Sequence, residues 1–96
     1  MRSGGKEYYQ SLDTRLSALL PELQSTIPLE NWRWFEEWIR AGEYGLAAEV
    51  AAESLVAVAK VPASLASELL SIAKMMALES DPIIQLRSRV SGSPRG

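Results

Sequence analysis

The sequence predicts an all-α protein, a compact bundle of four to five short helices. Apolar residues recur at helical spacing along nearly the whole chain, and the alternation typical of strands is absent. Val and Ile are sparse, whereas Ala, Leu and Glu dominate. With 96 residues, of which 47% are hydrophobic, the chain can form one domain with a modest core.

We expect a flexible head over residues 1–6, one helical domain over residues 7–90 and a disordered tail over residues 91–96. The first helix is expected over residues 7–20 and ends at Pro21, because a proline ring clashes with the preceding helical turn. The apolar stripe of this helix comprises Tyr8, Leu12, Leu16, Leu19 and Leu20.

The second helix is expected over residues 29–40. Pro28 suits its first turn, and Gly42 lies where a left-handed C-terminal cap is needed. The third helix, over residues 43–60, is apolar over most of its circumference and is the expected centre of the bundle. Gly45 near its start indicates either a sharp beginning or a close backbone contact. Its apolar residues include Leu46, Ala47, Val50, Ala51, Leu55, Val56 and Val58.

After a break at Pro62, a fourth helix is expected over residues 63–78 and a short fifth helix over residues 82–90. Asp81 followed by Pro82 is a typical N-cap signature for the fifth helix. The residues that these two helices are expected to bury are Leu65, Leu69, Ile72, Ala73, Met76, Ile83, Ile84 and Leu86.

The segment LENWRWFEEWIR, residues 29–40, carries all three tryptophans of the chain. A helical wheel directs one apolar stripe toward the core; Trp38 borders this stripe and Trp34 is displaced from it. Trp34 is therefore either a partner-binding residue, of the kind that dominates many interfaces, or a residue packed under the first or last helix. The predicted core stripe comprises Leu29, Trp32, Phe35 and Ile39.

Acidic residues are concentrated in the body of the chain. Residues 7–81 hold twelve acids against five bases, a net charge of −7, which repels nucleic-acid phosphates and favours basic partners. Six of these acids lie between residues 30 and 53, so we expect any interface there. For Glu49 and Glu53, one turn apart, a solvated face is the favoured interpretation. The candidate partner-binding residues are Glu30, Trp34, Glu37, Glu43, Tyr44, Glu49 and Glu53.

The chain has no histidine and no cysteine, which removes the commonest general base and every thiolate nucleophile or zinc ligand. The sequence GEYG at residues 42–45 lacks the lysine of a phosphate-binding loop and follows a predicted helix. The carboxylates of Glu49 and Glu53 alone are too few for a hard cation. We therefore expect no catalysis, no cofactor and no metal; a carboxylate-dependent enzyme is the alternative, and it requires a buried acid cluster.

No apolar run is long enough to predict a membrane span, and the start MRSGGKEYYQ lacks the apolar segment of a signal peptide, so we expect a cytoplasmic protein. Arg87, Arg89 and Arg95 near the C-terminus have two interpretations. They form a weak nucleic-acid-binding arm, or they are cations favoured at a helix C-terminus; the absence of interleaved aromatics favours the second.

The stretch WIRAGEYGLAAEVAAESL, residues 38–55, resembles the pattern of Maf-type immunity proteins, small helical proteins of bacterial polymorphic toxin systems. The similar positions are Ile39, Gly42, Glu43, Tyr44, Gly45, Leu46, Ala47 and Glu49. The proline break in KVPAS and the helix ending in MMAL are similar as well, so the resemblance covers residues 20–78. The chain departs from the pattern in its alanine-rich third helix and in Trp34, where a polar residue is more usual.

The resemblance implies a dedicated cytoplasmic inhibitor that binds a cognate toxin domain, as a monomer in a 1:1 complex, and blocks it without chemistry. Many toxins of such systems act on nucleic acid and are basic, which suits an acidic inhibitor. Occlusion of the toxin's active site is the first expected mechanism, and binding at a distant site is the second. Two alternatives are a small helical adaptor or regulatory module, and an obligate homo-oligomer that buries Trp34 by self-association.

Overall fold

The computed structural model describes residues 4–91, which form six α-helices and no strand. The all-α prediction is confirmed, with one helix more than the four to five expected. The helices are α1 (Gly4–Ser17), α2 (Leu20–Gln24), α3 (Leu29–Arg40), α4 (Tyr44–Val56), α5 (Ala63–Met75) and α6 (Asp81–Ser91).

The extra helix arises at Pro21, where the predicted end of the first helix is wrong. The chain leaves α1 at Ser17, and Pro21 lies in the first turn of the short helix α2, where a proline needs no backbone partner. At the other end, α1 begins at Gly4, so residues 4–6 of the predicted head are helical. Residues 1–3 and 92–96 lie outside the described residues, and so does most of the predicted tail.

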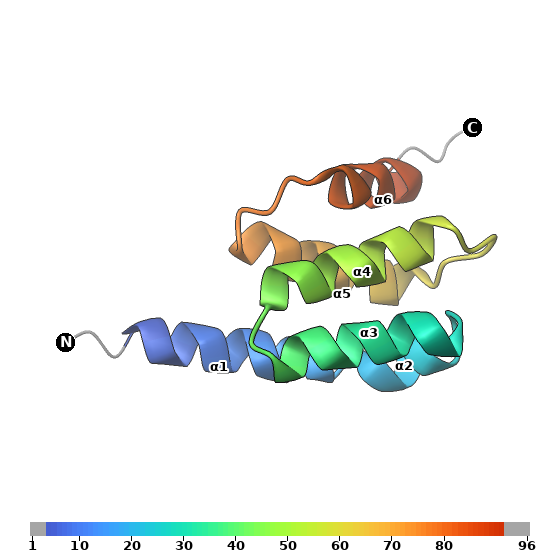
Figure 1. The fold of residues 1–96 in the computed structure, drawn as a ribbon. Helices are drawn as coiled ribbons and strands as arrows, with labels where there is room; N and C mark the ends of the chain where they lie inside the picture. Colours follow the sequence, from blue (N-terminus) through green and yellow to red (C-terminus); the bar gives the residue numbers. More distant parts are fainter. Residues whose placement is uncertain (1–3, 92–96) are drawn as a thin grey trace.

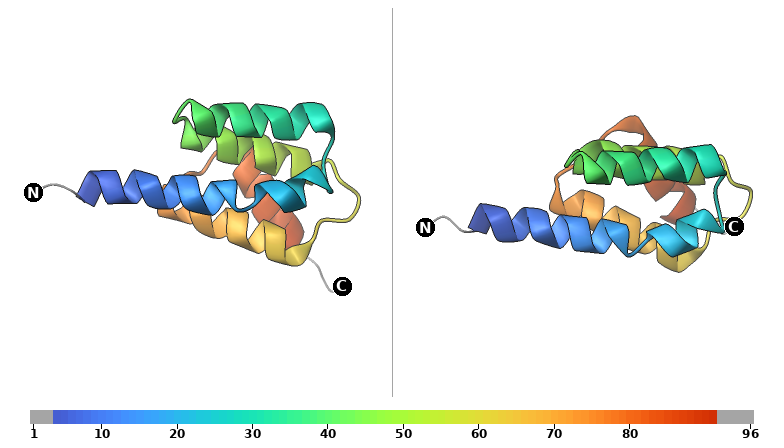
Figure 2. Two further views of the ribbon diagram at one scale, coloured as in Figure 1. Left: turned by 90° about the horizontal axis from the view of Figure 1, so that it is seen from below. Right: turned by 60° about the horizontal axis from the view of Figure 1, so that its bottom comes forward.

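Helix α4 lies at the centre of the bundle, as predicted, and packs against α1, α3, α5 and α6. Figure 1 shows α3 on one side of α4 and α6 crossing on the opposite side. The fully buried side chains of α4 include Ala47, Ala48, Ala51 and Ala52, and these small residues let the neighbouring helices approach closely. In contrast, the N-terminal turns of α1 project beyond the other helices (Figure 2).

Most of the predicted core is buried, but four expected members are exposed. Leu29 has 57% of its surface accessible. The buried side of α3 is centred on Phe35 and Ile39, and Leu29 lies at its edge. The other three are Tyr8, Leu46 and Ile84, each more than a third exposed at the margin of its helix's buried side. Trp32 and Trp38 are half-buried and pack against the core.

The cap predicted at Gly42 is confirmed. Gly42 has φ +79°; its N–H donates to the Ile39 carbonyl at 2.9 Å, and the Glu43 N–H donates to the Trp38 carbonyl at 2.8 Å. This is the Schellman arrangement, which satisfies the last carbonyls of α3 and turns the chain into α4. Gly45 has no neighbouring atom that a Cβ would meet within 4 Å, so it marks the start of α4 and not a close contact.

The end of α5 has the same arrangement without a glycine. Ala77 has φ +54°, its N–H donates to the Lys74 carbonyl at 3.0 Å, and the Leu78 N–H donates to the Ala73 carbonyl at 2.9 Å. This earlier turn ends the helix at Met75 instead of the predicted Leu78. A non-glycine residue at positive φ carries a steric cost that glycine avoids.

Helix α6 begins one residue earlier than predicted. Asp81 is its first residue, and the carbonyl of Ser80 accepts the Ile84 N–H at 3.0 Å, so Ser80 and not Asp81 holds the N-cap position. The Ser80 hydroxyl is buried and has no hydrogen-bond partner within the described residues.

Arg89 of α6 caps a different helix from its own. Its guanidinium donates to the carbonyls of Val56 and Val58 at 2.7 Å and of Ala59 at 3.0 Å, with a longer contact to Leu55 at 3.4 Å. These carbonyls end α4, where the chain stays right-handed at Ala57 and forms no glycine cap. Arg89 lies in the last turn of α6, as predicted, and its guanidinium also caps the end of α4.

Candidate functional site

The outer surface of α3 carries an exposed pair of tryptophans. Trp34 is 56% accessible and Trp38 is half-buried; their ring centroids are 6.1 Å apart with an angle of 27° between the planes. One helical turn separates the two residues, and the near-parallel rings form an offset stack. The alternative that Trp34 packs under the first or last helix is therefore wrong, and its role in partner binding stays a prediction.

A groove between α3 and α4 runs beside this pair. It has a volume of about 420 Å³, and we call it the α3–α4 groove; its lining residues are Glu30, Asn31, Trp34, Trp38, Val50, Glu53 and Ser54. Its floor is held by hydrogen bonds, since the Asn31 amide donates to the Ser54 hydroxyl and that hydroxyl donates to the Val50 carbonyl, each at 2.8 Å. Ser54 is buried, so this network fixes α3 against α4 beneath the exposed indoles.

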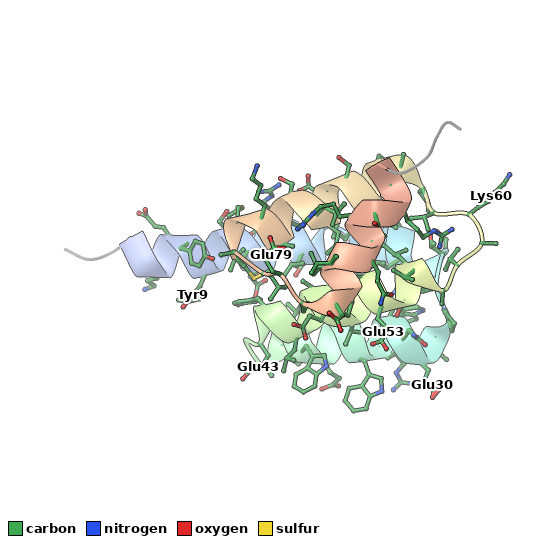
Figure 3. The ribbon with its side chains drawn as sticks, turned by 90° about the horizontal axis from the view of Figure 1, so that it is seen from above. Tyr9, Glu30, Glu43, Glu53, Lys60 and Glu79 are labelled. Atoms are coloured by element: carbon green, nitrogen blue, oxygen red, sulfur yellow. The ribbon has the colours of Figure 1, made fainter. Side chains whose placement is uncertain are left out.

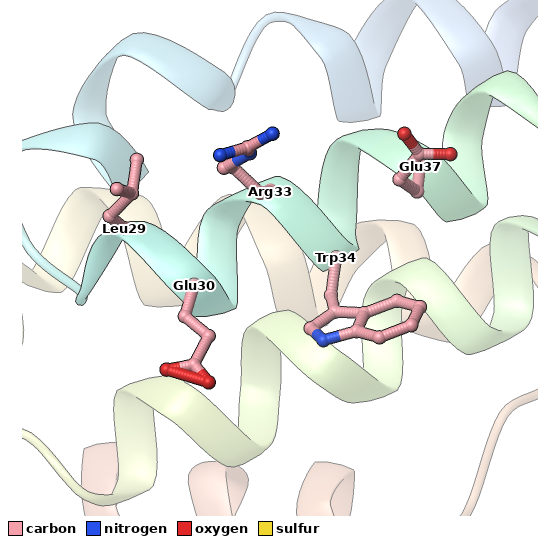
Figure 4. Close-up of a pocket in the computed structure, with 5 residues that line it drawn as sticks. All are labelled: Leu29, Glu30, Arg33, Trp34 and Glu37. Atoms are coloured by element: carbon pink, nitrogen blue, oxygen red, sulfur yellow. The ribbon is translucent and has the colours of Figure 1, made fainter.

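Successive turns of α3 divide its outer surface into two sides. Figure 4 shows Glu30 and Trp34 projecting on the side of α4, whereas Leu29, Arg33 and Glu37 project on the other. The spacing of three or four residues within each set explains this division. A second hollow, of about 500 Å³, extends over both sides and is lined by these same five residues.

The charges on the two sides differ in their pairing. Arg40 forms ion pairs with Glu36 at 3.6 Å and with Glu37 at 3.3 Å. Within the described part of the chain, neither Glu30 nor Glu53 forms an ion pair. The α3–α4 groove thus presents two carboxylates and a stacked indole pair to solvent.

The structure brings three of the seven predicted site residues together in this groove, namely Glu30, Trp34 and Glu53. Glu37 lines only the second hollow, on the other side of α3. Glu43 is exposed at the turn between α3 and α4, on the same edge of the molecule as Glu30 and Glu53 (Figure 3). Glu49 is half-buried on α4 and lines neither hollow.

Tyr44, the seventh predicted residue, faces α1 instead of the groove. Its hydroxyl donates to Asp13 at 2.9 Å, and its ring stacks on Tyr9 at a centroid distance of 6.3 Å. The hydrogen bond to Asp13, partial desolvation and the Asp13 charge raise the pKa of Tyr44 above its usual 10.0. We call Tyr9, Asp13 and Tyr44 the α1–α4 contact. Asp13 and Tyr9 were not predicted, because a wheel of α1 alone gives no indication of which residue of α4 it meets.

Among the described residues, no three acidic side chains gather in a way that could hold a metal ion. None of the described helices combines the length and the apolar character needed to cross a membrane. Arg15 of α1 forms an ion pair with Glu68 of α5, with 2.9 Å between Nη2 and Oε2. Glu68 therefore also has a structural contact.

Comparisons with models of protein families, with curated proteins and with solved structures give no match for this chain. The resemblance to Maf-type immunity proteins therefore stays a prediction from the sequence.

Proposed function

We propose that the chain is a non-catalytic inhibitor that binds a protein partner through the α3–α4 groove, as an immunity protein binds a toxin domain in the cytoplasm. The observation that carries this proposal is the exposed Trp34, which stacks on Trp38 in a groove that is also lined by two carboxylates without ion pairs. An indole in this position adds little to the stability of the fold. When a partner covers it, a tryptophan of this kind can contribute about 2 kcal/mol or more to binding.

The order already present in the groove supports tight binding. Trp34 rests on Trp38, which packs against the core, and the Asn31–Ser54 hydrogen bond holds the two helices that form the groove. A surface that keeps its shape loses less conformational entropy when a partner docks. Binding by this surface needs no catalytic group, which agrees with a chain that has no histidine and no cysteine.

The charge of the groove favours a basic partner over a second copy of the chain. A symmetric dimer formed through this groove would bring Glu30 and Glu53 of one copy against the same residues of the other. Such like-charge contacts are unfavourable, whereas a basic surface would be attracted and steered toward the groove. We therefore favour the inhibitor over the homo-oligomer. A helical adaptor would use the same groove and differ only in its partner.

A rescue experiment tests the proposal. The C-terminal domain of a candidate toxin from the same genome would be expressed with and without this chain, and surviving cells counted. We expect the chain to restore survival and to co-purify with that domain, and Trp34→Ala to reduce both. Tyr9→Ala, which removes an exposed ring outside the groove, is the matched control.

Persistent toxicity despite soluble expression of the chain, with no co-purification, would contradict the inhibitor proposal. The mass of the isolated chain by light scattering would then separate the two alternatives. A monomer points to the adaptor, and a dimer that Trp34→Ala dissociates points to the homo-oligomer.

A further inference from the structure

We propose that the α3–α4 groove binds an arginine side chain of the partner, with its guanidinium against the open face of Trp34 and paired with Glu30 and Glu53. This inference deepens the proposed function and rests on it, because the protein partner supplies the arginine. It names the chemical group that the groove recognises.

The position of Trp34 provides a surface for a planar cation. Trp38 stacks on one side of its ring and leaves the rest of the indole exposed. Figure 4 shows one ring face turned outward and the indole nitrogen on the side of Glu30. Cations within about 6 Å of an indole face are attracted to it, and arginine is found there more often than lysine.

The carboxylates provide the charge that such a cation needs. Glu30 and Trp34 of α3 line one wall of the groove, and Glu53 of α4 lines the other. In Figure 3 both glutamates lie on the side of the molecule formed by α3 and α4. A guanidinium has five N–H donors in a planar fork, so it can stack on the ring and donate to carboxylates at its edge.

The chain's own arginines near the groove do not supply this cation. Arg33 projects from the other side of α3 (Figure 4), and Arg40 is paired with Glu36 and Glu37. The polar groups of the floor, Asn31 and Ser54, already bond to each other. The two groove glutamates are therefore the carboxylates available to an incoming basic side chain. The stacked indoles favour a side chain with a planar cationic group.

Two-dimensional NMR of the intact chain tests this with three blocked tripeptides as probes. Each has glycine at both ends, and the central residue is arginine, lysine or citrulline, the neutral analogue of arginine with nearly the same shape. The signal followed is the indole N–H of Trp34, identified by its absence in Trp34→Phe. We expect the arginine peptide to shift this signal in the millimolar range, the lysine peptide to bind more weakly, and the citrulline peptide to leave it unchanged.

Variants of the groove locate the site. Glu30→Gln and Glu53→Gln should each weaken arginine-peptide binding by about threefold, as expected for one exposed ion pair. Glu7→Gln removes an exposed carboxylate of α1, which lines neither hollow beside Trp34, and should leave binding unchanged. An equal shift by the citrulline peptide, no shift by the arginine peptide, or an equal loss in Glu7→Gln would each overturn the inference.

This test is independent of the rescue experiment. Arginine binding without rescue or co-purification would leave the site standing and remove the proposed function. Rescue by Glu30→Gln and Glu53→Gln as strong as that by the unaltered chain, with no arginine-peptide binding, would leave the proposed function standing and remove the arginine site.

Discussion

The α3–α4 groove and the α1–α4 contact both combine exposed aromatic rings with carboxylates, but they differ in how the polar groups are paired. In the α1–α4 contact the Tyr44 hydroxyl donates to Asp13. In the groove, Glu30 and Glu53 have no ion-pair partner among the described residues, and the indoles of the groove stack on each other. A surface rich in acids and rings is therefore a candidate interface only where those groups are left unpaired.

The internal pairing of the α1–α4 contact has a structural purpose. Helix α1 projects from the bundle, and few of its residues are buried (Figure 2). Polar contacts hold it to the body: Tyr44 with Asp13 at 2.9 Å, Arg15 with Glu68 at 2.9 Å, and Tyr8 with the Met75 carbonyl at 3.3 Å. We infer that Tyr8 and Tyr44 secure the fold and leave recognition to the tryptophans.

The largest expected effect is on partner binding. Trp34→Ala should lower the affinity for the partner about 30-fold or more, because it removes the exposed indole that binding would desolvate. Tyr9→Ala, which removes a ring with 57% exposure, should change the affinity less than threefold, within the scatter of ordinary surface substitutions. Titration calorimetry with the co-purified partner measures both affinities. Equal losses of affinity would show that the groove contributes no more to binding than the α1–α4 contact.

The stability of the isolated chain should respond in the opposite way. Tyr44→Phe removes the hydrogen bond to Asp13 and should lower the free energy of unfolding by about 1 kcal/mol. Trp34→Phe, a change at an exposed ring, should alter it by less than about 0.5 kcal/mol. Urea denaturation followed by circular dichroism gives both values; a larger loss in Trp34→Phe would show that the indole pair supports the fold.

The charge around Trp34 should be visible in its fluorescence. Each quencher is compared with its effect on free N-acetyltryptophanamide, because iodide is intrinsically the more efficient of the two. On that scale, the emission that Trp34→Phe removes should be quenched more strongly by caesium ions than by iodide, because the groove is acidic. The difference between quenching by caesium and by iodide should decrease as added salt approaches about 1 M, where charges are screened within roughly 3 Å. Preferential quenching by iodide would mean that Arg33 dominates the local potential.

The smallest expected effect is the pH dependence at Tyr44. Its pKa is raised in the folded state, so the neutral phenol is favoured by folding, and this contribution is complete below pH 10.0. It is lost as the pH rises through the higher folded pKa, when the hydroxyl can no longer donate to Asp13. The stability gap between the unaltered chain and Tyr44→Phe should therefore narrow above pH 10.0, in urea titrations at neutral and alkaline pH. A constant gap would contradict the role of Asp13.

The sequence predicted the parts of the fold that depend on local rules. The bounds of α3 were predicted as residues 29–40, because Pro28 and Gly42 mark both ends. Pro21 misled the prediction because a proline both stops one helix and starts the next. The turn at Ala77 could not be predicted from local signals, since alanine rarely takes positive φ.

The candidate site was predicted only in part, for a related reason. A helical wheel identified Trp34 as displaced from the core, because that question concerns one helix. Whether Tyr44 or Glu53 lies beside Trp34 depends on which helices meet, and no period in the sequence contains that information. Asp13, which accepts the hydrogen bond from Tyr44, lies 31 residues away in the sequence. This contact gives Tyr44 a structural role in place of the predicted role in binding.

The cap that Arg89 provides for α4 has a consequence for the order of assembly. Arg89 reaches carbonyls that lie 30 to 34 residues earlier in the chain, and α6 is the last described helix to leave the ribosome. Until α6 docks, the end of the central helix must be satisfied by water, and its last turn frays. The C-terminal cap of the central helix is therefore completed only after the last described helix has been synthesised.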